Sequence, residues 1–189
     1  MQFKFLAFFT ILASLLFLGC DSKETSAKSS EEIIKVEEPK KEKFTTFKLK
    51  TNDGQIIEAV PTETGMVFKG YEDKAILLNF WATWCRPCKA EIPHLNNLRE
   101  KYKGKFEIIA VLLEENKDQQ MLNAFILTYK MKYPVTNGYE NFVLAQAVGG
   151  VKSIPTMFMF DKKGKLIQKF VGIVPEEMLE SDIKKALGI

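Results

Sequence analysis

The residues of this chain whose types and spacing best suit a chemical reaction are Cys85 and Cys88, two cysteines separated by two residues. They follow an apolar run of strand length, Ala75–Phe80, and open an amphipathic segment from about Cys85 to Tyr102. Two cysteines so spaced at a helix start can close a small disulfide ring. The first thiol lies where unpaired backbone N–H groups and the helix dipole stabilise an anion, so it can attack as a thiolate. The second, one turn into the helix, can resolve the mixed disulfide that forms.

Other uses of the cysteine pair fit the sequence less well. A zinc site needs two ligands besides Cys85 and Cys88. The chain offers only Cys20, which is distant in sequence, and His94, which lies on the same predicted helix as the cysteine pair. A purely structural disulfide is a second alternative. A peroxidatic cysteine is a third, but Asn79 and Ala82 stand near the places where peroxiredoxins carry Thr and Pro. We therefore predict no metal and no cofactor besides the redox-active disulfide itself.

The composition restricts the remaining classes of protein. The 189 residues allow one domain plus extra segments, and 46% hydrophobic with 27% charged residues exclude global disorder. A net charge of +3, from 27 basic and 24 acidic residues, is too small to indicate nucleic-acid binding. Three cysteines cannot form a disulfide scaffold. No apolar run of 18 residues follows the N-terminal segment, which excludes a multi-pass membrane protein.

The N-terminus reads as a targeting segment. Lys4 is followed by a mostly apolar stretch, Phe5–Leu18, which is shorter than the about 20 residues of a membrane span but suits a secretory signal. The Leu-Gly-Cys sequence that ends at Cys20 resembles a bacterial lipoprotein cleavage box, although Phe17 stands where Leu is usual. We predict a signal peptide over 1–19 and lipidation of Cys20. An uncleaved N-terminal anchor is the alternative, and either places the rest of the chain outside the cytoplasm.

Residues 20–43 are expected to be the lipidated cysteine and a flexible charged linker. Ser, Glu and Lys dominate this segment, which cannot bury enough apolar surface to fold. A charged helix over part of Glu31–Lys43 is the alternative, but Pro39 opposes a long one. Residues 44–189 are expected to form the folded domain.

Alternating strand and helix patterns predict an α/β domain with a mixed central sheet flanked by helices. An N-terminal β-hairpin is expected first, with Phe47 and Leu49 on one strand and Gln55–Val60 as the return strand. Further strands are predicted at Ala75–Phe80, Phe106–Leu113, Thr156–Phe160 and Lys165–Val171, and helices at Cys85–Tyr102, Gln119–Met131, Glu140–Val148 and Glu176–Leu187.

The segment FWATWCRPC, Phe80–Cys88, resembles the active-site signature of the thioredoxin superfamily, and its context is most similar to the membrane-anchored TlpA/ResA-like branch. The resemblance extends from about Phe44 to Ile189. It implies a thioredoxin-like fold with a helical insert within Leu113–Gly150. It also implies that Cys85 is the nucleophile and Cys88 the resolving cysteine.

The same resemblance assigns further residues to the site. The stretch Gly150–Thr156 resembles the segment that carries the cis-proline, so Pro155 is expected to be cis and to face the disulfide. The backbone of Ile154 would then pair with an extended substrate. Trp84 beside the disulfide is a candidate substrate contact, although surface packing is as good an interpretation. Glu91 matches a glutamate of the branch and is expected to handle the proton of Cys88; a solvated helix glutamate is the alternative.

Two positions differ from related families. Asn79 replaces the buried Asp that helps proton transfer in cytoplasmic thioredoxins. Thr156 stands where cytochrome-maturation reductases of the CcmG type carry an acidic residue, which weakens a dedicated role in that pathway.

These features together favour a lipid-anchored thiol-disulfide oxidoreductase that faces the periplasm or extracytoplasmic space. We expect it to reduce disulfides in target proteins, for example apocytochrome c, and to be re-reduced by a membrane thiol electron donor. Arg86 beside the thiolate favours the opposite direction, a disulfide oxidase or isomerase, whereas an ionised Glu91 would act against it. A non-catalytic binding lipoprotein of the same fold is a third hypothesis. No nucleic-acid partner is expected.

Overall fold

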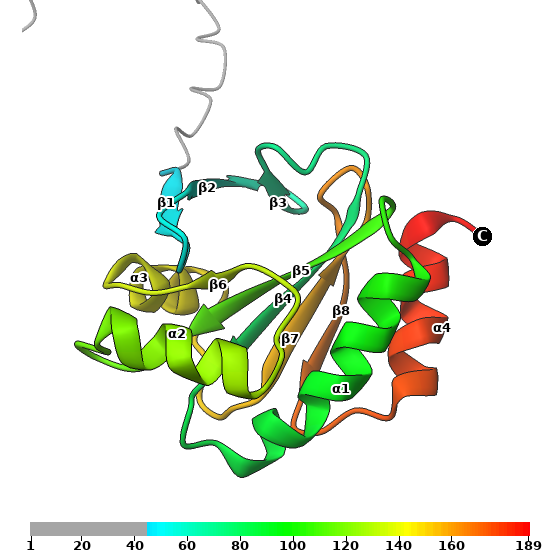
Figure 1. The fold of residues 1–189 in the computed structure, drawn as a ribbon. Coiled ribbons are helices and arrows are strands. Elements are labelled where there is room, and N and C mark those ends of the chain that lie inside the picture. Colours follow the sequence, from blue (N-terminus) through cyan, green and yellow to red (C-terminus); the bar gives the residue numbers. More distant parts are fainter. Residues whose placement is uncertain (1–44) are drawn as a thin grey trace, which may run out of the picture. The chain divides into compact units, whose positions relative to one another are not determined.

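The structure is a computed structural model that describes residues 45–189. The predicted signal peptide, Cys20 and the whole of the predicted linker lie outside the described residues. The expected α/β architecture is confirmed for the rest of the chain (Figure 1).

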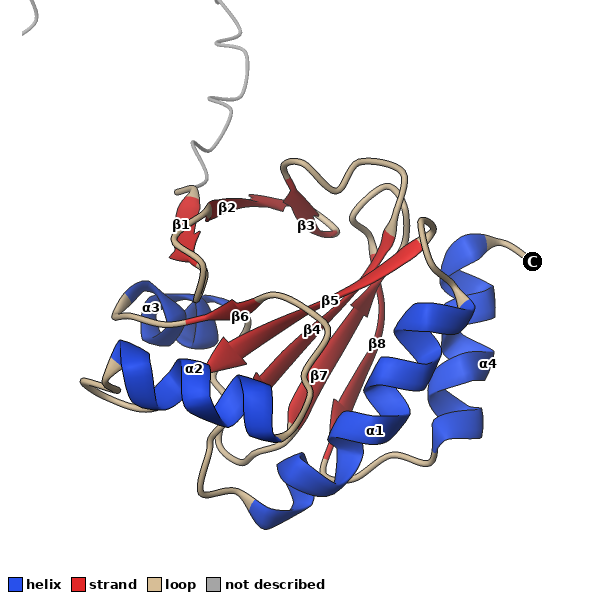
Figure 2. Cartoon of the chain, in the orientation of Figure 1, coloured by secondary structure: helices blue, strands red, loops and turns tan. Residues whose placement is uncertain are grey.

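A five-stranded mixed sheet forms the centre of the domain, and Figure 2 shows its strands side by side. Three neighbouring strands of this sheet are parallel, the fourth is antiparallel to them, and the last is antiparallel to the fourth. Strands β4 (Ala75–Trp81), β5 (Phe106–Leu112) and β7 (Thr156–Phe160) are buried along their whole length, which explains their continuous apolar sequences. In spatial order the strands are β6 (Val135–Thr136), β5 (Phe106–Leu112), β4 (Ala75–Trp81), β7 (Thr156–Phe160) and β8 (Leu166–Val171).

Two apolar cores lie on the two faces of this sheet. Residues of β4 alternate between them, with Leu77 in the core beneath three of the helices and Leu78 in the core on the other face. The first core is covered by α1 (Arg86–Lys101), α2 (Gln119–Thr128) and α4 (Glu176–Leu187). The second is covered by α3 (Glu140–Ala147) and by a small separate sheet of β1 (Phe47–Lys50), β2 (Ile56–Thr62) and β3 (Gly65–Phe68).

The prediction of an N-terminal hairpin was incomplete. The hairpin of β1 and β2 is present, and a third strand, β3, extends it into an antiparallel meander. β3 has only four residues, too few for a clear alternating pattern. It begins at Gly65, where a Cβ atom would lie 2.2 Å from the carbonyl oxygen of Gly164. Glycine is therefore required for the close approach of this strand to the turn before β8.

Two smaller differences concern the segment between β5 and β7. The helix predicted over Gln119–Met131 ends at Thr128, and Lys130 has a positive φ of 54°, which a helix interior does not tolerate. The expected insert within Leu113–Gly150 is not purely helical, because it also holds the two-residue strand β6. A strand that short leaves no periodic signal in the sequence.

Candidate redox-active site

The two cysteines of the predicted motif form a disulfide at the start of α1. Cys85 is the N-cap residue of the helix, and its Sγ accepts a hydrogen bond from the backbone N–H of Cys88 at 3.2 Å. Both side chains are buried. Pro87 lies in the first turn, where a missing N–H leaves no helix hydrogen bond unmade. A thiolate on Cys85 would face the unpaired N–H groups of the helix N-terminus, which stabilise negative charge.

Pro155 lies at the same edge of the sheet as the disulfide loop. The Ile154–Pro155 peptide bond is cis, as predicted. Phe80 near the end of β4 pairs with Thr156 at the start of β7, which places Pro155 next to the point where the chain leaves β4 for the cysteines. Its carbonyl oxygen accepts a hydrogen bond from the N–H of Gly172 at 2.8 Å. This bond fixes the proline against the loop that leads from β8 to α4.

Glu91 lies on the buried face of α1 and is not solvated. It follows Cys88 by three residues, so both side chains lie on the sheet-facing side of the helix. Glu91 is 2% exposed, and its Oε1 accepts a hydrogen bond from the N–H of Val174 at 3.0 Å. Burial raises the pKa of this carboxyl from 4.5 to about 7, although the Val174 hydrogen bond and the charge of His94 act in the other direction. Such a group can take up and release a proton near neutral pH.

The two tryptophans of the motif have different environments. Trp81 ends β4, is buried, and packs against Phe125 of α2 with 5.3 Å between ring centroids. Trp84, directly before the disulfide, is 66% exposed. Ile154 is half-buried and packs against both cores. Trp84 is therefore available to a partner, whereas Trp81 is a core residue.

The loop before the disulfide is held by a contact that sequence reasoning missed. The backbone N–H of Thr83 donates to a carboxylate oxygen of Glu114, and the Thr83 hydroxyl accepts from Lys117 Nζ at 2.9 Å. Lys117 and Glu114 also form an ion pair of 3.1 Å. The signal for this contact was an acidic residue just after the carboxyl end of a buried parallel strand, an edge where functional groups gather.

Comparison with known proteins agrees with this geometry. A family model described as Redoxin matches residues 39–187, more than half of the chain. The chain belongs to the Redoxin family.

Individual relatives of this Redoxin chain are named for thiol-disulfide chemistry. The "Thiol-disulfide oxidoreductase ResA" of Bacillus thuringiensis subsp. konkukian is 39% identical over 118 residues, which is 62% of this chain and 66% of the relative. The chain therefore matches slightly less than two thirds of that relative's length. The resemblance to the TlpA/ResA-like branch of the thioredoxin superfamily is confirmed.

Two solved structures from Chlorobium tepidum show the same thioredoxin-like fold. A thiol:disulfide interchange protein of the thioredoxin family aligns with a TM-score of 0.63 at 26% identity, over 76% of this chain and 94% of the other. A putative thiol:disulfide interchange protein DsbE aligns with a TM-score of 0.58 at 30% identity, over 76% of this chain and 100% of the other.

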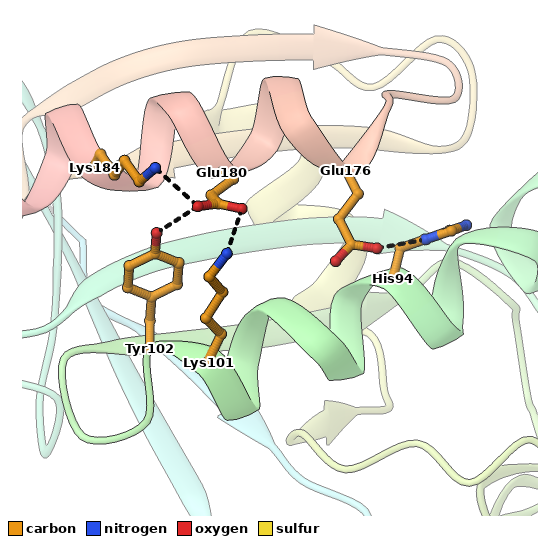
Figure 3. A network of polar contacts seen from close by, with 6 residues as sticks. All are labelled: His94, Lys101, Tyr102, Glu176, Glu180 and Lys184. Carbon is orange, nitrogen blue, oxygen red and sulfur yellow. Dashed lines mark hydrogen bonds and ion pairs between the residues drawn. The ribbon is translucent and has the colours of Figure 1, made fainter.

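A polar network fastens α1 to α4 in this Redoxin chain (Figure 3). Glu180 accepts hydrogen bonds from Lys101 at 2.8 Å, Lys184 at 2.9 Å and Tyr102 at 3.0 Å. These three contacts lower the pKa of Glu180 to about 2. A second contact, 2.7 Å between His94 Nδ1 and a Glu176 oxygen, joins the same two helices, and it places the only histidine on the surface. The contact between His94 and Glu176 lies at the start of α4, two residues after Val174.

Two further observations are limited to residues 45–189. There, no three His, Cys, Asp or Glu side chains lie together as a metal site would require. None of the helices in this part of the chain is both long and apolar enough to cross a membrane.

Proposed function

We propose that this protein is a membrane-anchored, extracytoplasmic thiol-disulfide oxidoreductase that reduces disulfides in target proteins. The observation that carries the proposal is the disulfide of Cys85 and Cys88 at the N-terminus of α1, with buried Glu91 one turn further along. The names of the relatives support the same chemistry. The redox-active disulfide is proposed to be the only cofactor.

The reduced enzyme begins the reaction with the Cys85 thiolate. This thiolate attacks a sulfur of the target disulfide, forms a mixed disulfide and releases one target thiolate. Glu91 then takes the proton of the Cys88 thiol, and the Cys88 thiolate attacks the Cys85 sulfur. The second target thiolate leaves, and the Cys85–Cys88 disulfide forms. Two electrons have passed to the target, and the Glu91 proton leaves with a target thiol.

Substrate binding is proposed at the edge formed by Pro155 and Trp84. Ile154 lies two residues before Thr156, which pairs with Phe80 near the end of β4, and its backbone is proposed to pair with an extended target segment. Trp84 supplies exposed apolar surface directly beside the attacking sulfur.

The cellular setting of the proposal rests on the N-terminal sequence. Residues 1–19 would be removed, lipid on Cys20 would anchor the protein, and residues 20–43 would hold the domain of residues 44–189 away from the membrane. A membrane thiol donor would re-reduce the disulfide. Apocytochrome c is the proposed example of a target; Thr156, in place of an acidic residue, favours a broader range of targets.

Single-cysteine variants of the full chain test the mechanism with a protein disulfide as substrate. Cys85→Ala is expected to abolish turnover, whereas Cys88→Ala should accumulate a mixed disulfide that is visible by non-reducing electrophoresis. Cys20→Ala is the matched control, which should keep the chemistry and lose membrane attachment. Full reductase activity in Cys85→Ala would show the mechanism to be wrong.

The direction of electron flow is tested by the reduction potential of the cysteine pair. A value near that of thioredoxin, about −270 mV, supports a reductase that needs a donor. A value near that of the strong oxidant DsbA, about −120 mV, would reverse the direction and favour the oxidase that Arg86 suggests. A protein that keeps its phenotype with both cysteines changed to Ser would be a binding lipoprotein instead.

A further inference from the structure

Four buried side-chain polar atoms within residues 45–189 have no hydrogen-bond partner in the protein, and they share one layer of the fold. They are Asn79 Oδ1, Trp81 Nε1, Glu91 Oε2 and the Tyr133 hydroxyl. Asn79 and Trp81 lie two residues apart on β4, so both face the core beneath the helices that also contains Cys88. Buried polar groups are nearly always paired. Their presence in the layer that contains the resolving cysteine therefore indicates a shared role.

Tyr133 is fixed in this layer by the segment that precedes it. The Asn96 side chain on α1 donates to the carbonyl oxygen of Lys130 at 2.9 Å and accepts from the N–H of Lys132 at 3.0 Å. Tyr133 follows directly, is 5% exposed, and packs in the same core as Cys88. Glu91 precedes Asn96 by five residues, about 7.5 Å along the helix axis. Because the neighbouring Lys132 is held against Asn96, the side chain of Tyr133 can extend along α1 across most of the distance between Asn96 and Glu91.

The groups around Glu91 leave Tyr133 as the candidate hydrogen-bond donor for its Oε2 atom. Burial raises the pKa of Tyr133, and the negative charge of Glu91 raises it further, so the two groups lie within electrostatic reach. The tyrosine thus stays protonated and can donate its hydrogen. His94 is the other charged group that acts on Glu91, and Cys88, which can titrate only after the disulfide is reduced, lies one turn before it; both are on α1 itself. The β8–α4 loop contributes the backbone N–H of Val174, which is already used by Oε1.

We propose that Tyr133 is a positioning residue for Glu91, and that the Tyr133 hydroxyl hydrogen-bonds to the ionised Oε2 of Glu91 through one buried water. The inference deepens the proposed function, since it rests on Glu91 as the acceptor of the Cys88 proton. The Cys88 thiol loses its proton to the Glu91 carboxylate, which becomes a carboxylic acid. Tyr133 loses no proton at any stage. Its hydrogen bond stabilises the carboxylate and so lets Glu91 be ionised before the transfer.

The test is an NMR titration of the Glu91 carboxyl in the full, oxidised chain with ¹³C-labelled glutamate, assigned with Glu91→Gln. Tyr133→Phe removes a single oxygen atom and is expected to raise the pKa of Glu91 by about one pH unit, since a hydrogen bond to a charged group is lost. Tyr139→Phe, which changes an exposed tyrosine, is the matched control and should leave it unchanged. An unchanged or lowered pKa of Glu91 in Tyr133→Phe overturns the proposal.

A second measurement keeps the test independent of any repacking in the phenylalanine variant. Site-specific 3-fluorotyrosine at position 133 keeps the hydroxyl and makes it a stronger donor, so the pKa of Glu91 should fall. No decrease counts against the proposal. Both titrations use the oxidised protein without turnover, so they can fail while the reductase assay succeeds. Conversely, activity retained in Cys85→Ala rejects the proposed function without changing either titration.

Discussion

Glu114 accepts a hydrogen bond from the backbone N–H of Thr83 and thereby ties the loop after β5 to the loop that carries the cysteines. Lys117 completes the contact by binding both residues, at 2.9 Å from Thr83 and 3.1 Å from Glu114. Thr83 precedes Cys85 by two residues, so the position of the first sulfur depends on a side chain that is distant in sequence. Burial raises the pKa of Glu114, but the hydrogen bonds from Thr83, followed by the contact with Lys117, outweigh burial and lower this pKa below its ordinary value, which keeps Glu114 ionised.

Replacing Glu114 with Ala should therefore destabilise the oxidised protein by about 2 kcal/mol, because the Thr83 N–H and the Lys117 ammonium lose their acceptor. Urea denaturation followed by fluorescence measures the change. Glu115→Ala, at the exposed neighbouring position, is the control and should stay within about 0.5 kcal/mol of the parent. Equal stability of the two variants would mean that the contact does not hold the loop.

The buried Glu91 predicts a specific pH dependence of stability. Its pKa in the folded protein, about 7, lies above the ordinary value of 4.5. The carboxyl therefore contributes its full stability below about pH 4.5 and loses it as the pH rises through 7. Glu91→Gln removes this loss, so its stability relative to the parent should increase by about 3 kcal/mol between pH 4 and pH 9.

Urea midpoints of the oxidised protein at a series of pH values measure the effect without interference from thiols. Glu177→Gln changes an exposed carboxyl of α4 and should show no such trend. If Glu91→Gln and the parent keep a constant difference across this range, Glu91 does not titrate as the structure indicates.

Trp84 is predicted to serve binding of the target rather than folding. Trp84→Ala should lower kcat/KM for a protein disulfide about fivefold, as expected for an aromatic contact residue, and leave the rate with a small disulfide unchanged. Leu127→Ala on α2, also highly exposed, is the control for loss of apolar surface. A parallel loss with both substrates would place the effect on the cysteines instead.

Asn141 should be a determinant of stability away from the redox chemistry. It is buried at the start of α3, and its Nδ2 donates to the carbonyl oxygens of Leu112 at 2.8 Å and Thr136 at 2.9 Å. Asn141→Ala leaves these acceptors unpaired and should cost about 3 kcal/mol in the free energy of unfolding. Gln146→Ala, on an exposed position of the same helix, should change it by less than about 0.5 kcal/mol. Comparable values for both would contradict the role of Asn141.

Strong local patterns explain why most of the fold was predictable. The runs that became β4 and β5 are buried on both faces, so their apolar character is continuous and visible in the sequence. β3 and β6 escaped prediction because four-residue and two-residue strands are selected by their neighbours in the sheet rather than by their own pattern. The helix α2 ended early for a similar reason, a backbone turn at Lys130 that Asn96 of α1 holds.

The sequence by itself determined the chemistry, because the spacing of Cys85 and Cys88 at a helix start is local and the disulfide needs nothing distant to form. The cis-proline at Pro155 was expected from the resemblance of Gly150–Thr156 to the corresponding segment of the thioredoxin superfamily. The environment of Glu91 was decided only by the tertiary structure. The hydrogen bond from Val174 comes from a chain segment far from Glu91 in sequence, and the burial of Glu91 is a property of the assembled layer. A local pattern can place a carboxyl on a helix face, but the pKa of that carboxyl depends on what the folded chain packs against it.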